Sequence, residues 1–185
     1  MGVSGSGKTT LARALAECLG WDFLDADDFH PPENIAKMTA GIPLDDSDRT
    51  PWLDVIHERL LSTLKADRRP VLACSALKEK YRAQLLDGLD GIVIVHLAGS
   101  YELIRSRLQG RRGHFMKAEM LRSQFEALES PPHALTVDVS TPLDEAVETV
   151  PGTIDARMDK TPILWAGAAR KPASTRAGDA ESSPP

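Results

Sequence analysis

The sequence predicts an α/β fold with a mainly parallel sheet and helices on both faces. Short apolar runs alternate along the chain with segments that have helical spacing. Within these runs nearly every residue is apolar, as in strands that are covered on both faces. The length of 185 residues, with 42% hydrophobic and 26% charged residues, indicates one globular domain with a single sizeable core.

The first half of the chain is predicted to contain three helices and a short strand. Apolar residues at helical spacing from Leu11 to Leu19 predict a helix that ends at Gly20. A strand over residues 21–24 leads into the loop DADDFHPP, where the prolines exclude regular structure. A short helix is expected over residues 33–40. After the loop GIPLDDSDRTP, an amphipathic helix is expected over residues 52–66.

The second half repeats the alternation of strands and helices. The apolar runs PVLACSAL, GIVIVHLAG and HALTVDVS predict buried strands. Helices are expected over residues 78–86, 101–108 and 117–129, and from 143 to 149, with an extension towards Met158 despite Pro151. From about residue 160 the chain is rich in Ala, Ser, Pro and Gly and has no period. We therefore predict a domain over residues 1–158 and a disordered tail over 159–185.

Composition excludes several classes of function. The net charge of −5 gives no electrostatic reason to expect nucleic acid as the main partner. No apolar run approaches the ~18 residues of a membrane span, and no secretory signal is visible. Cys18 and Cys74 are too few for a disulfide framework and are interpreted as buried free thiols. These features predict a soluble cytoplasmic protein.

The stretch GVSGSGKTT predicts a phosphate-binding loop that opens the first helix. It satisfies the pattern G-x-x-x-x-G-K-[ST], whose glycines let backbone N–H groups turn towards phosphates. Lys8 would place its charge on the β- and γ-phosphates, and Thr9 would offer a hydroxyl to Mg²⁺. The residues predicted to bind a nucleoside triphosphate are Gly2, Val3, Ser4, Gly5, Ser6, Gly7, Lys8, Thr9 and Thr10.

Three carboxylates follow the strand at residues 21–24. In an extended segment Asp25 and Asp27 would face the same way, towards the phosphate loop, and Asp28 would face away. This pattern suits phosphoryl transfer to a hydroxyl, with Asp25 near the metal beside Thr9 and Asp27 accepting the hydroxyl proton. The alternative is a solvated acidic loop. His30, just before two prolines, is either a turn residue or part of the site.

The basic residues form two groups. Arg111 lies between Gly110 and Gly113 and is predicted to belong to a mobile lid over about residues 105–116 that closes over the phosphates. Lys78, Lys80 and Arg82 follow the end of a predicted strand, where ligands bind in open α/β sheets. The alternative for each is a solvated charge on a helix surface.

Several stretches together resemble one family. GVSGSGKTT, FLDADDFHPPENIAKMTAGIPLDDSDRTPWL, CSALKEKYR, RRGHFM and SQFEALE are similar to the gluconokinases of the short P-loop type, which are relatives of shikimate and adenylate kinases. The resemblance covers Gly2 to about Val150. It implies a P-loop kinase three-layer sandwich, and ATP-dependent phosphorylation of D-gluconate at its terminal hydroxyl with Mg²⁺. It also points to a homodimer.

The resemblance implies roles for individual residues. Gly2 to Thr9 would hold ATP, Lys8 and Arg111 would act in catalysis, and Asp27 would face the substrate hydroxyl. The gluconate pocket, mostly over residues 27–53, would be lined by Asp27, His30, Lys37, Arg49, Lys78, Arg82, His114 and Gln124. Arg49 and Arg82 are the candidates for binding the gluconate carboxylate, and the sequence does not choose between them.

The most important departure from the family is at the start of the sequence. Gluconokinases have an apolar strand before the first glycine, and here Met1 alone precedes it. We therefore expect the first strand to be missing from the sheet, with a coding start that lies upstream as the simplest explanation. The alternatives to a gluconokinase are a shikimate or nucleoside monophosphate kinase, and a truncated nucleotide-binding protein with little activity.

Overall fold

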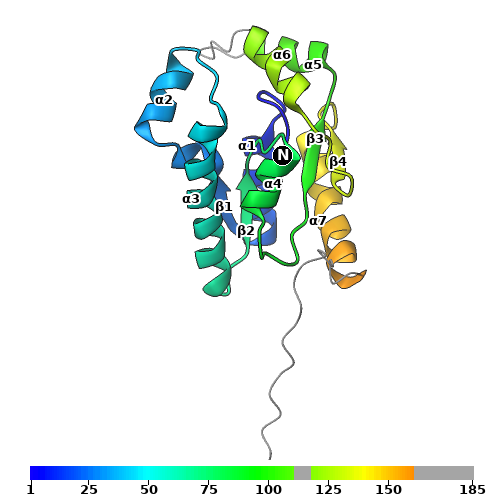
Figure 1. Cartoon of the computed structure of the whole chain (residues 1–185). Helices are drawn as coiled ribbons and strands as arrows, with labels where there is room; N and C mark the ends of the chain where they lie inside the picture. Colours follow the sequence, from blue (N-terminus) through cyan, green and yellow to red (C-terminus); the bar gives the residue numbers. More distant parts are fainter. Residues whose placement is uncertain (111–117, 161–185) are drawn as a thin grey trace, which may run out of the picture.

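The computed structural model describes residues 1–110 and 118–160 and consists of helices around short parallel strands (Figure 1). The elements in chain order are α1 (Lys8–Leu19), β1 (Asp22–Asp25), the 3-10 helix η1 (Ala26–Phe29), α2 (Pro32–Thr39), α3 (Asp46–Lys65), β2 (Pro70–Ala73), α4 (Glu79–Leu85), β3 (Val95–Ala98), α5 (Tyr101–Gln109), α6 (Ala118–Ala127), β4 (Leu135–Asp138) and α7 (Leu143–Lys160). Residues 161–185 of the tail predicted over 159–185 lie outside the described residues. None of the described helices is long and apolar enough to cross a membrane.

The strands form two parallel pairs. β1 pairs with β2 from Asp22 opposite Pro70 to Asp25 opposite Ala73. β3 pairs with β4 from Val95 opposite Leu135 to Ala98 opposite Asp138. Among the described residues, no strand joins β2 to β3, so the sheet consists of two separate ladders.

Helices cover the strands from both sides. α1 packs on β1, β2 and α7, whereas α3 packs on α4, β2 and η1 (Figure 1). Two apolar clusters accompany these layers. The first includes Leu11, Leu15, Leu97, Ile104, Leu121 and Val150, and the second includes Trp52, Leu53, Ile56, Leu60, Tyr81 and Leu85. The predicted α/β class, with parallel strands and helices on both faces, is confirmed.

Several boundaries differ from the prediction. α3 begins at Asp46, six residues before the expected start, because Asp45 and Asp48 form a capping box that satisfies the first backbone N–H groups. This box brings Arg49 into the helix. α7 continues through Pro151 to Lys160, beyond the expected end near Met158.

Two further predictions need correction. The run GIVIVHLAG was expected to be a long strand, but only Val95–Ala98 is regular. Among the described residues, β3 has a neighbouring strand only on its β4 side, so the residues before Val95 have no second strand to pair with. Cys18 is exposed, and only Cys74 is buried, because Cys18 lies beside the buried stripe of α1 formed by residues 11, 12, 15 and 16.

Candidate active site

The phosphate loop packs closely against β3 and α5. Gly5 has a φ of 81°, and a Cβ at this position would lie 2.6 Å from Cγ of Leu108 on α5. A Cβ at Gly2 would lie 2.8 Å from the backbone oxygen of Leu97. Both positions therefore require glycine, since real Cβ atoms do not approach so closely and L residues avoid these φ values. The loop leads directly into α1 at Lys8, where the helix dipole favours bound anions.

Two polar contacts position the loop. The Nζ of Lys8 donates to the backbone oxygen of Val3 at 2.9 Å, so the ammonium group lies over the loop. The backbone N–H of Ser4 donates to Oε1 of Gln124 at 2.6 Å, across 120 residues of sequence. Gln124 lies on α6, so α5 and α6 both contact the loop. The prediction for Gln124 was a place near gluconate, and its contact in the structure is with the phosphate loop.

The two residues predicted to bind the metal lie together. Oγ1 of Thr9 donates to Oδ2 of Asp25 at 3.0 Å, from the start of α1 to the end of β1. A hydroxyl and a carboxylate at the phosphate loop are the oxygen ligands that Mg²⁺ prefers beside nucleotide phosphates. The described residues contain no cluster of three or more His, Cys, Asp or Glu side chains that could hold a metal by themselves. The pair thus fits an ion that is completed by phosphates and water.

Asp27 follows Asp25, but not in an extended segment. Residues Ala26–Phe29 form η1, and the other oxygen of Asp25, Oδ1, accepts the backbone N–H of Asp27 at 3.2 Å. Alternation of side chains along a strand therefore does not explain the position of Asp27. Its carboxylate is 82% exposed, with Oδ1 4.0 Å from Nε2 of His30. This exposure leaves Asp27 accessible to a substrate.

His30 is part of a buried platform. Its ring stacks on Trp52, with centroids 4.3 Å apart, and its side chain is 5% exposed. Trp52 in turn donates from Nε1 to the backbone oxygen of Ala26 in η1 at 2.8 Å. Burial lowers the pKa of His30, and Arg49 lowers it further against an opposing effect of Asp27. The imidazole is therefore neutral at physiological pH.

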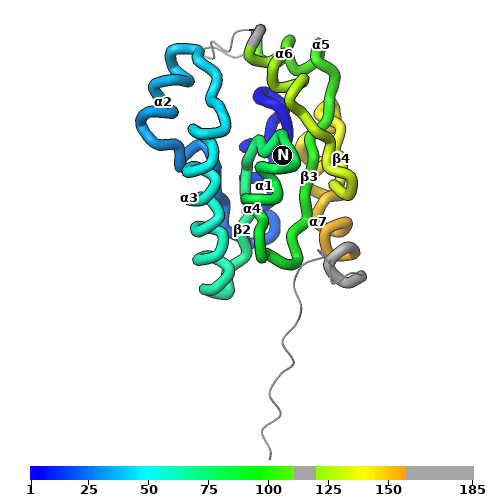
Figure 2. Tube along the Cα trace, in the orientation of Figure 1, coloured from blue at the N-terminus to red at the C-terminus, as the bar shows by residue number. Residues whose placement is uncertain are grey.

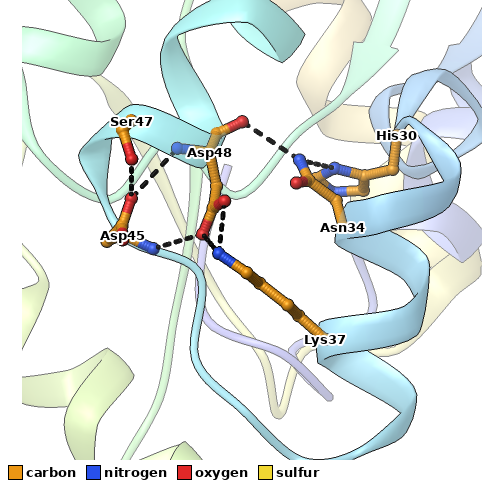
Figure 3. Close-up of polar contacts among 6 residues, drawn as sticks. All are labelled: His30, Asn34, Lys37, Asp45, Ser47 and Asp48. Atoms are coloured by element: carbon orange, nitrogen blue, oxygen red, sulfur yellow. Dashed lines mark hydrogen bonds and ion pairs between the residues drawn. The ribbon is translucent and has the colours of Figure 1, made fainter.

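Lys37 is held in an ion pair at the start of α3. Its Nζ lies 2.6 Å and 2.8 Å from the two oxygens of Asp48, which also caps α3 (Figure 3). The hydrogen bond with Lys37 lowers the pKa of Asp48 and raises that of Lys37. Asn34 joins the same group, because its amide donates to the backbone oxygen of Asp48 at 3.0 Å and lies 3.4 Å from Nδ1 of His30. These contacts connect α2 to α3.

Tyr81 brings the predicted basic residues together. The guanidinium of Arg49 donates to the Tyr81 hydroxyl at 3.3 Å, and its Cζ lies 5.5 Å from the ring centroid. The ammonium group of Lys78 lies 5.7 Å and that of Lys80 5.5 Å from the same centroid. Asp46 accepts hydrogen bonds from Lys80 and from the Tyr81 hydroxyl, which lowers its pKa to about 2. We refer to Arg49, Lys78, Lys80 and Tyr81 as the basic cluster.

Arg82 does not belong to the basic cluster. It is only 4% exposed. One of its nitrogens donates to the backbone oxygens of Ala76 and Leu77, both at 3.0 Å, and the other two contact Glu79 at 3.0 Å and 2.6 Å. The guanidinium therefore stabilises the turn between β2 and α4. This geometry favours Arg49 over Arg82 as the residue that meets a carboxylate.

Two groups of predicted site residues come together in the structure. The phosphate loop, Thr9 and Asp25 come together, and a second group joins His30, Lys37 and Arg49 through α2 and α3. Arg111 and His114 lie outside the described residues, so their roles stay predictions. Sequence reasoning assigned no role to Tyr81, Asp46 or Asn34. All three nevertheless lie in stretches that carry the family resemblance, Tyr81 in CSALKEKYR and the other two in the long stretch over residues 23–53.

Comparisons with known proteins agree with this geometry. A family model described as an AAA domain matches residues 1–131. The thermoresistant gluconokinase of Escherichia coli is 42% identical over 151 residues, covering 80% of this chain and 86% of that protein. The gluconokinase of Gluconobacter oxydans is 50% identical over 131 residues, covering 71% and 74%.

Solved structures give the same result. A crystal structure of a gluconokinase from Sinorhizobium meliloti superposes with a TM-score of 0.77 at 44% identity, covering 86% of this chain and 91% of that one. A crystal structure of a sugar kinase from Janibacter superposes with a TM-score of 0.78 at 42% identity, covering 84% and 91%. The motifs, the parallel strands and these likenesses over most of the chain lead to one conclusion: the protein belongs to the gluconokinase family of P-loop kinases.

Proposed function

We propose that this protein transfers the γ-phosphoryl group of ATP to the terminal hydroxyl of D-gluconate, giving 6-phospho-D-gluconate and ADP. The observation that carries the proposal is the chain of contacts from Thr9 through Asp25 to Asp27. These contacts connect the phosphate loop to an exposed carboxylate, so the phosphoryl donor ATP and the acceptor hydroxyl can be brought together beside Asp27. Phosphoryl transfer requires this kind of positioning, with charge stabilisation around the transferred group.

The phosphate loop supplies the nucleotide side of the reaction. Backbone N–H groups between Gly2 and Thr10 would hold the triphosphate, and Lys8 would move from its contact with Val3 onto the β- and γ-phosphates. Thr9 and Asp25 would hold Mg²⁺, which when bound neutralises charge on the phosphates. Ser6 supports a loop that is completed by a ligand, because its hydroxyl is buried without a hydrogen-bond partner among the described residues.

The acceptor side uses Asp27 and His30. Asp27 would accept the proton of the terminal hydroxyl as that oxygen attacks the γ-phosphorus. Neutral His30 lies 4.0 Å from the Asp27 carboxylate and is fixed by Trp52, so it would orient the carboxylate or a sugar hydroxyl. Because His30 is neutral, one ring nitrogen donates and the other accepts.

The basic cluster would bind the far end of gluconate. Arg49 and Lys78 present cationic groups around the buried ring of Tyr81, and a carboxylate matches the planar fork of an arginine. Lys37 is already neutralised by Asp48, so we assign it to shaping the pocket and to hydroxyl contacts rather than to the carboxylate. Arg82 is assigned a structural role, because its guanidinium is bound by the backbone oxygens of Ala76 and Leu77 and by Glu79. Arg111 and His114 retain the lid roles that the family resemblance implies.

A coupled assay tests the proposal. The full chain is supplied with ATP and Mg²⁺ and with D-gluconate, shikimate or nucleoside monophosphates in turn, and ADP release is followed. We expect turnover with gluconate that exceeds turnover with the other acceptors by at least ~10²-fold, since a site built for hydroxyls rejects acceptors that leave its polar groups unpaired. A folded chain that binds ATP and phosphorylates none of them would favour the nucleotide-binding alternative.

Assembly and location follow from the same proposal. We propose a homodimer in the cytoplasm, as the family resemblance implies. Light scattering after size-exclusion chromatography tests the first point. A molecular mass of one chain, about 20.1 kDa, at micromolar concentration would rule the dimer out.

A further inference from the structure

The helix α2 buries a polar side chain and exposes its apolar ones. Within α2, all of which the structure describes, only Asn34 is buried, at 3% exposed. Ile35 and Met38 of the same helix are 50% and 36% exposed. Helices of globular proteins normally bury their apolar side chains, and burial of an amide is costly unless the amide is hydrogen-bonded. The inverted arrangement indicates that the contacts of the Asn34 amide determine how α2 sits on the protein.

The amide nitrogen of Asn34 lies between the start of α3 and the ring of His30. Nδ2 donates to the backbone oxygen of Asp48 at 3.0 Å and lies 3.4 Å from Nδ1 of His30 (Figure 3). Figure 2 shows α2 at one edge of the molecule, beside the start of α3. A side-chain amide nitrogen carries two N–H groups, so it has one for each of these neighbours.

The backbone oxygen of Asp48 decides which way the amide points. A backbone oxygen can only accept a hydrogen bond, so the atom of Asn34 that faces it must be the nitrogen and not the oxygen. The same nitrogen faces His30, and an amide nitrogen can only donate. Nδ1 of His30 therefore accepts, which means that it carries no proton.

The imidazole ring of His30 has no better alternative. It stacks on Trp52 with an interplanar angle of 10°, so the plane of the ring is fixed. Turning the ring over within this plane would place a C–H against the Asn34 amide, and a proton on Nδ1 would set one N–H against another. Burial lowers the pKa of His30, so the ring is neutral and has one proton. That proton must lie on Nε2.

Nε2 faces the acceptor side of the site. It lies 4.0 Å from Oδ1 of Asp27, which is too long for a direct hydrogen bond. An oxygen atom about 2.8 Å from each of these two atoms would fit between them, because 4.0 Å is less than twice that length. A hydroxyl in this position can donate its proton to Asp27 and accept the Nε2–H of His30.

This arrangement specifies the direction of the acceptor hydroxyl. A hydroxyl oxygen has two lone pairs. With its proton on Asp27 and one lone pair on the N–H of His30, it keeps the second lone pair for attack on the γ-phosphorus. In the other tautomer Nε2 would present a lone pair, which would repel the carboxylate of Asp27 and compete with it for the hydroxyl proton. The position of one proton on His30 therefore decides how the hydroxyl is held.

We propose that Asn34 is a positioning residue of the acceptor site: its amide holds His30 in the tautomer with the proton on Nε2, and this N–H orients the acceptor hydroxyl between His30 and Asp27. Asn34 acts through His30 and is not itself a catalytic residue. The first part of the proposal rests on the contacts of Asn34 alone. The second part deepens the proposed function and rests on it.

Nitrogen NMR of the full chain tests the tautomer. Two-dimensional ¹⁵N–¹H spectra at about pH 8, where neutral imidazole predominates, distinguish a protonated ring nitrogen from an unprotonated one. The chain has five histidines, and the signals of His30 are identified by their loss in His30→Phe. We expect the Nε2–H form to exceed the Nδ1–H form by roughly tenfold or more, because only the first form accepts the Asn34 hydrogen bond. A ring that is mainly protonated on Nδ1 would overturn the proposal.

Substitutions of Asn34 test the cause. Asn34→Asp presents only acceptor oxygens or a single O–H, which Asp48 takes, so Nδ1 of His30 should become protonated. Asn34→Leu is of similar size and has no donor, so the ratio of the two tautomers should fall by about threefold or more, towards that of free imidazole. An unchanged ratio in Asn34→Leu would overturn the role of Asn34.

Lys37→Met is the matched control. It breaks the ion pair that joins α2 to α3 through the Asp48 carboxylate, and it leaves the Asn34 amide in place. The tautomer ratio of His30 should therefore be the same as in the unsubstituted chain. A shift as large as that in Asn34→Leu would trace the effect to a loosened α2 and overturn the proposal.

Steady-state kinetics test the effect on the hydroxyl. Asn34→Leu should lower kcat with gluconate by roughly tenfold or more and change KM for ATP by less than about twofold, since orientation of the hydroxyl matters in the transition state. A shifted tautomer with an unchanged kcat would overturn the second part of the proposal. The NMR measurement involves neither ATP nor gluconate. A chain that shows the expected tautomers but does not phosphorylate gluconate would therefore overturn the proposed function and support the effect of Asn34 on His30.

Discussion

Replacing Arg49 and Arg82 in turn distinguishes a substrate contact from a structural one. Both are arginines near the carboxyl ends of the strands, and both were candidates for the gluconate carboxylate. The structure places the Arg49 guanidinium on Tyr81 in the basic cluster and the Arg82 guanidinium on two buried backbone oxygens. Methionine at each position retains the length of the side chain and removes the charge.

The expected magnitudes follow from these contacts. A hydrogen bond to a charged group contributes about 1.5–3 kcal/mol, so Arg49→Met should lower kcat/KM for gluconate by roughly 10- to 150-fold. Its effect on the melting temperature should be small, because Arg49 is partly exposed and bonds within the protein to one hydroxyl. Arg82→Met leaves the buried oxygen of Ala76 without a donor, whereas the oxygen of Leu77 retains the N–H of Glu129, so the expected cost is about 1–3 kcal/mol. For a domain of this size that lowers the melting temperature by roughly 2–12 °C.

Steady-state kinetics and thermal unfolding of the same preparations check both predictions. KM for ATP should change by less than about twofold in Arg49→Met, and Arg49→Lys should recover part of the loss because it restores the charge but not the planar fork. The reasoning is refuted if Arg49→Met retains normal gluconate kinetics while Arg82→Met, measured well below its melting temperature, loses them.

Four other predictions concern the phosphate loop, the acceptor site and pH. Lys8→Ala should lower kcat by at least ~10²-fold, because it removes charge stabilisation from the transferred group, and a nearly normal rate would mean that the loop is not catalytic. Asp27→Asn should lower kcat far more than ATP affinity; a change confined to ATP binding would assign Asp27 to the metal. Gln124→Met should raise KM for ATP by about tenfold through the lost acceptor of the Ser4 N–H, with an unchanged KM for gluconate, and the opposite pattern would place Gln124 at the sugar acid. The pKa of His30 is lowered in the fold, so the contribution of neutral His30 to stability is complete above pH ~6.5 and is lost as pH falls below that value. His30→Phe retains an aromatic ring against Trp52 but cannot be protonated. Its melting temperature should therefore depend less on pH between 7 and 5 than that of the unsubstituted chain.

The sequence predicted best where a function depends on neighbouring residues. The phosphate loop and α1 form a continuous segment, so the spacing of Gly2, Gly7, Lys8 and Thr9 specifies the local geometry by itself. The start of α3 could have been predicted in the same way, because Asp45 and Asp48 lie at the spacing of a capping box. Pro51 concealed that signal by suggesting a loop. Even so, the family motifs predict that the whole segment over residues 27–53 belongs to the acceptor site.

Side-chain direction could not be predicted, because it depends on elements that meet only in the fold. Arg49 finds Tyr81 across 32 residues of sequence, and Ser4 finds Gln124 across 120. A long arginine side chain can turn towards a pocket or into the turn beneath it, and the sequence is the same in both cases. The buried oxygens of Ala76 and Leu77 decide the direction of Arg82, since an unsatisfied buried carbonyl is costly.

By itself, the sequence determined the family, the α/β class and the phosphate loop, and it predicted a set of candidate residues for the acceptor site. All of these are properties of local spacing and of residue chemistry. The tertiary structure alone decided which cations gather around Tyr81, which are neutralised by partners such as Asp48, and how large and how apolar the cavity between β2 and β3 is. These properties depend on which distant segments satisfy a buried polar group or fill a given volume in the folded chain. No single stretch of sequence specifies those contacts.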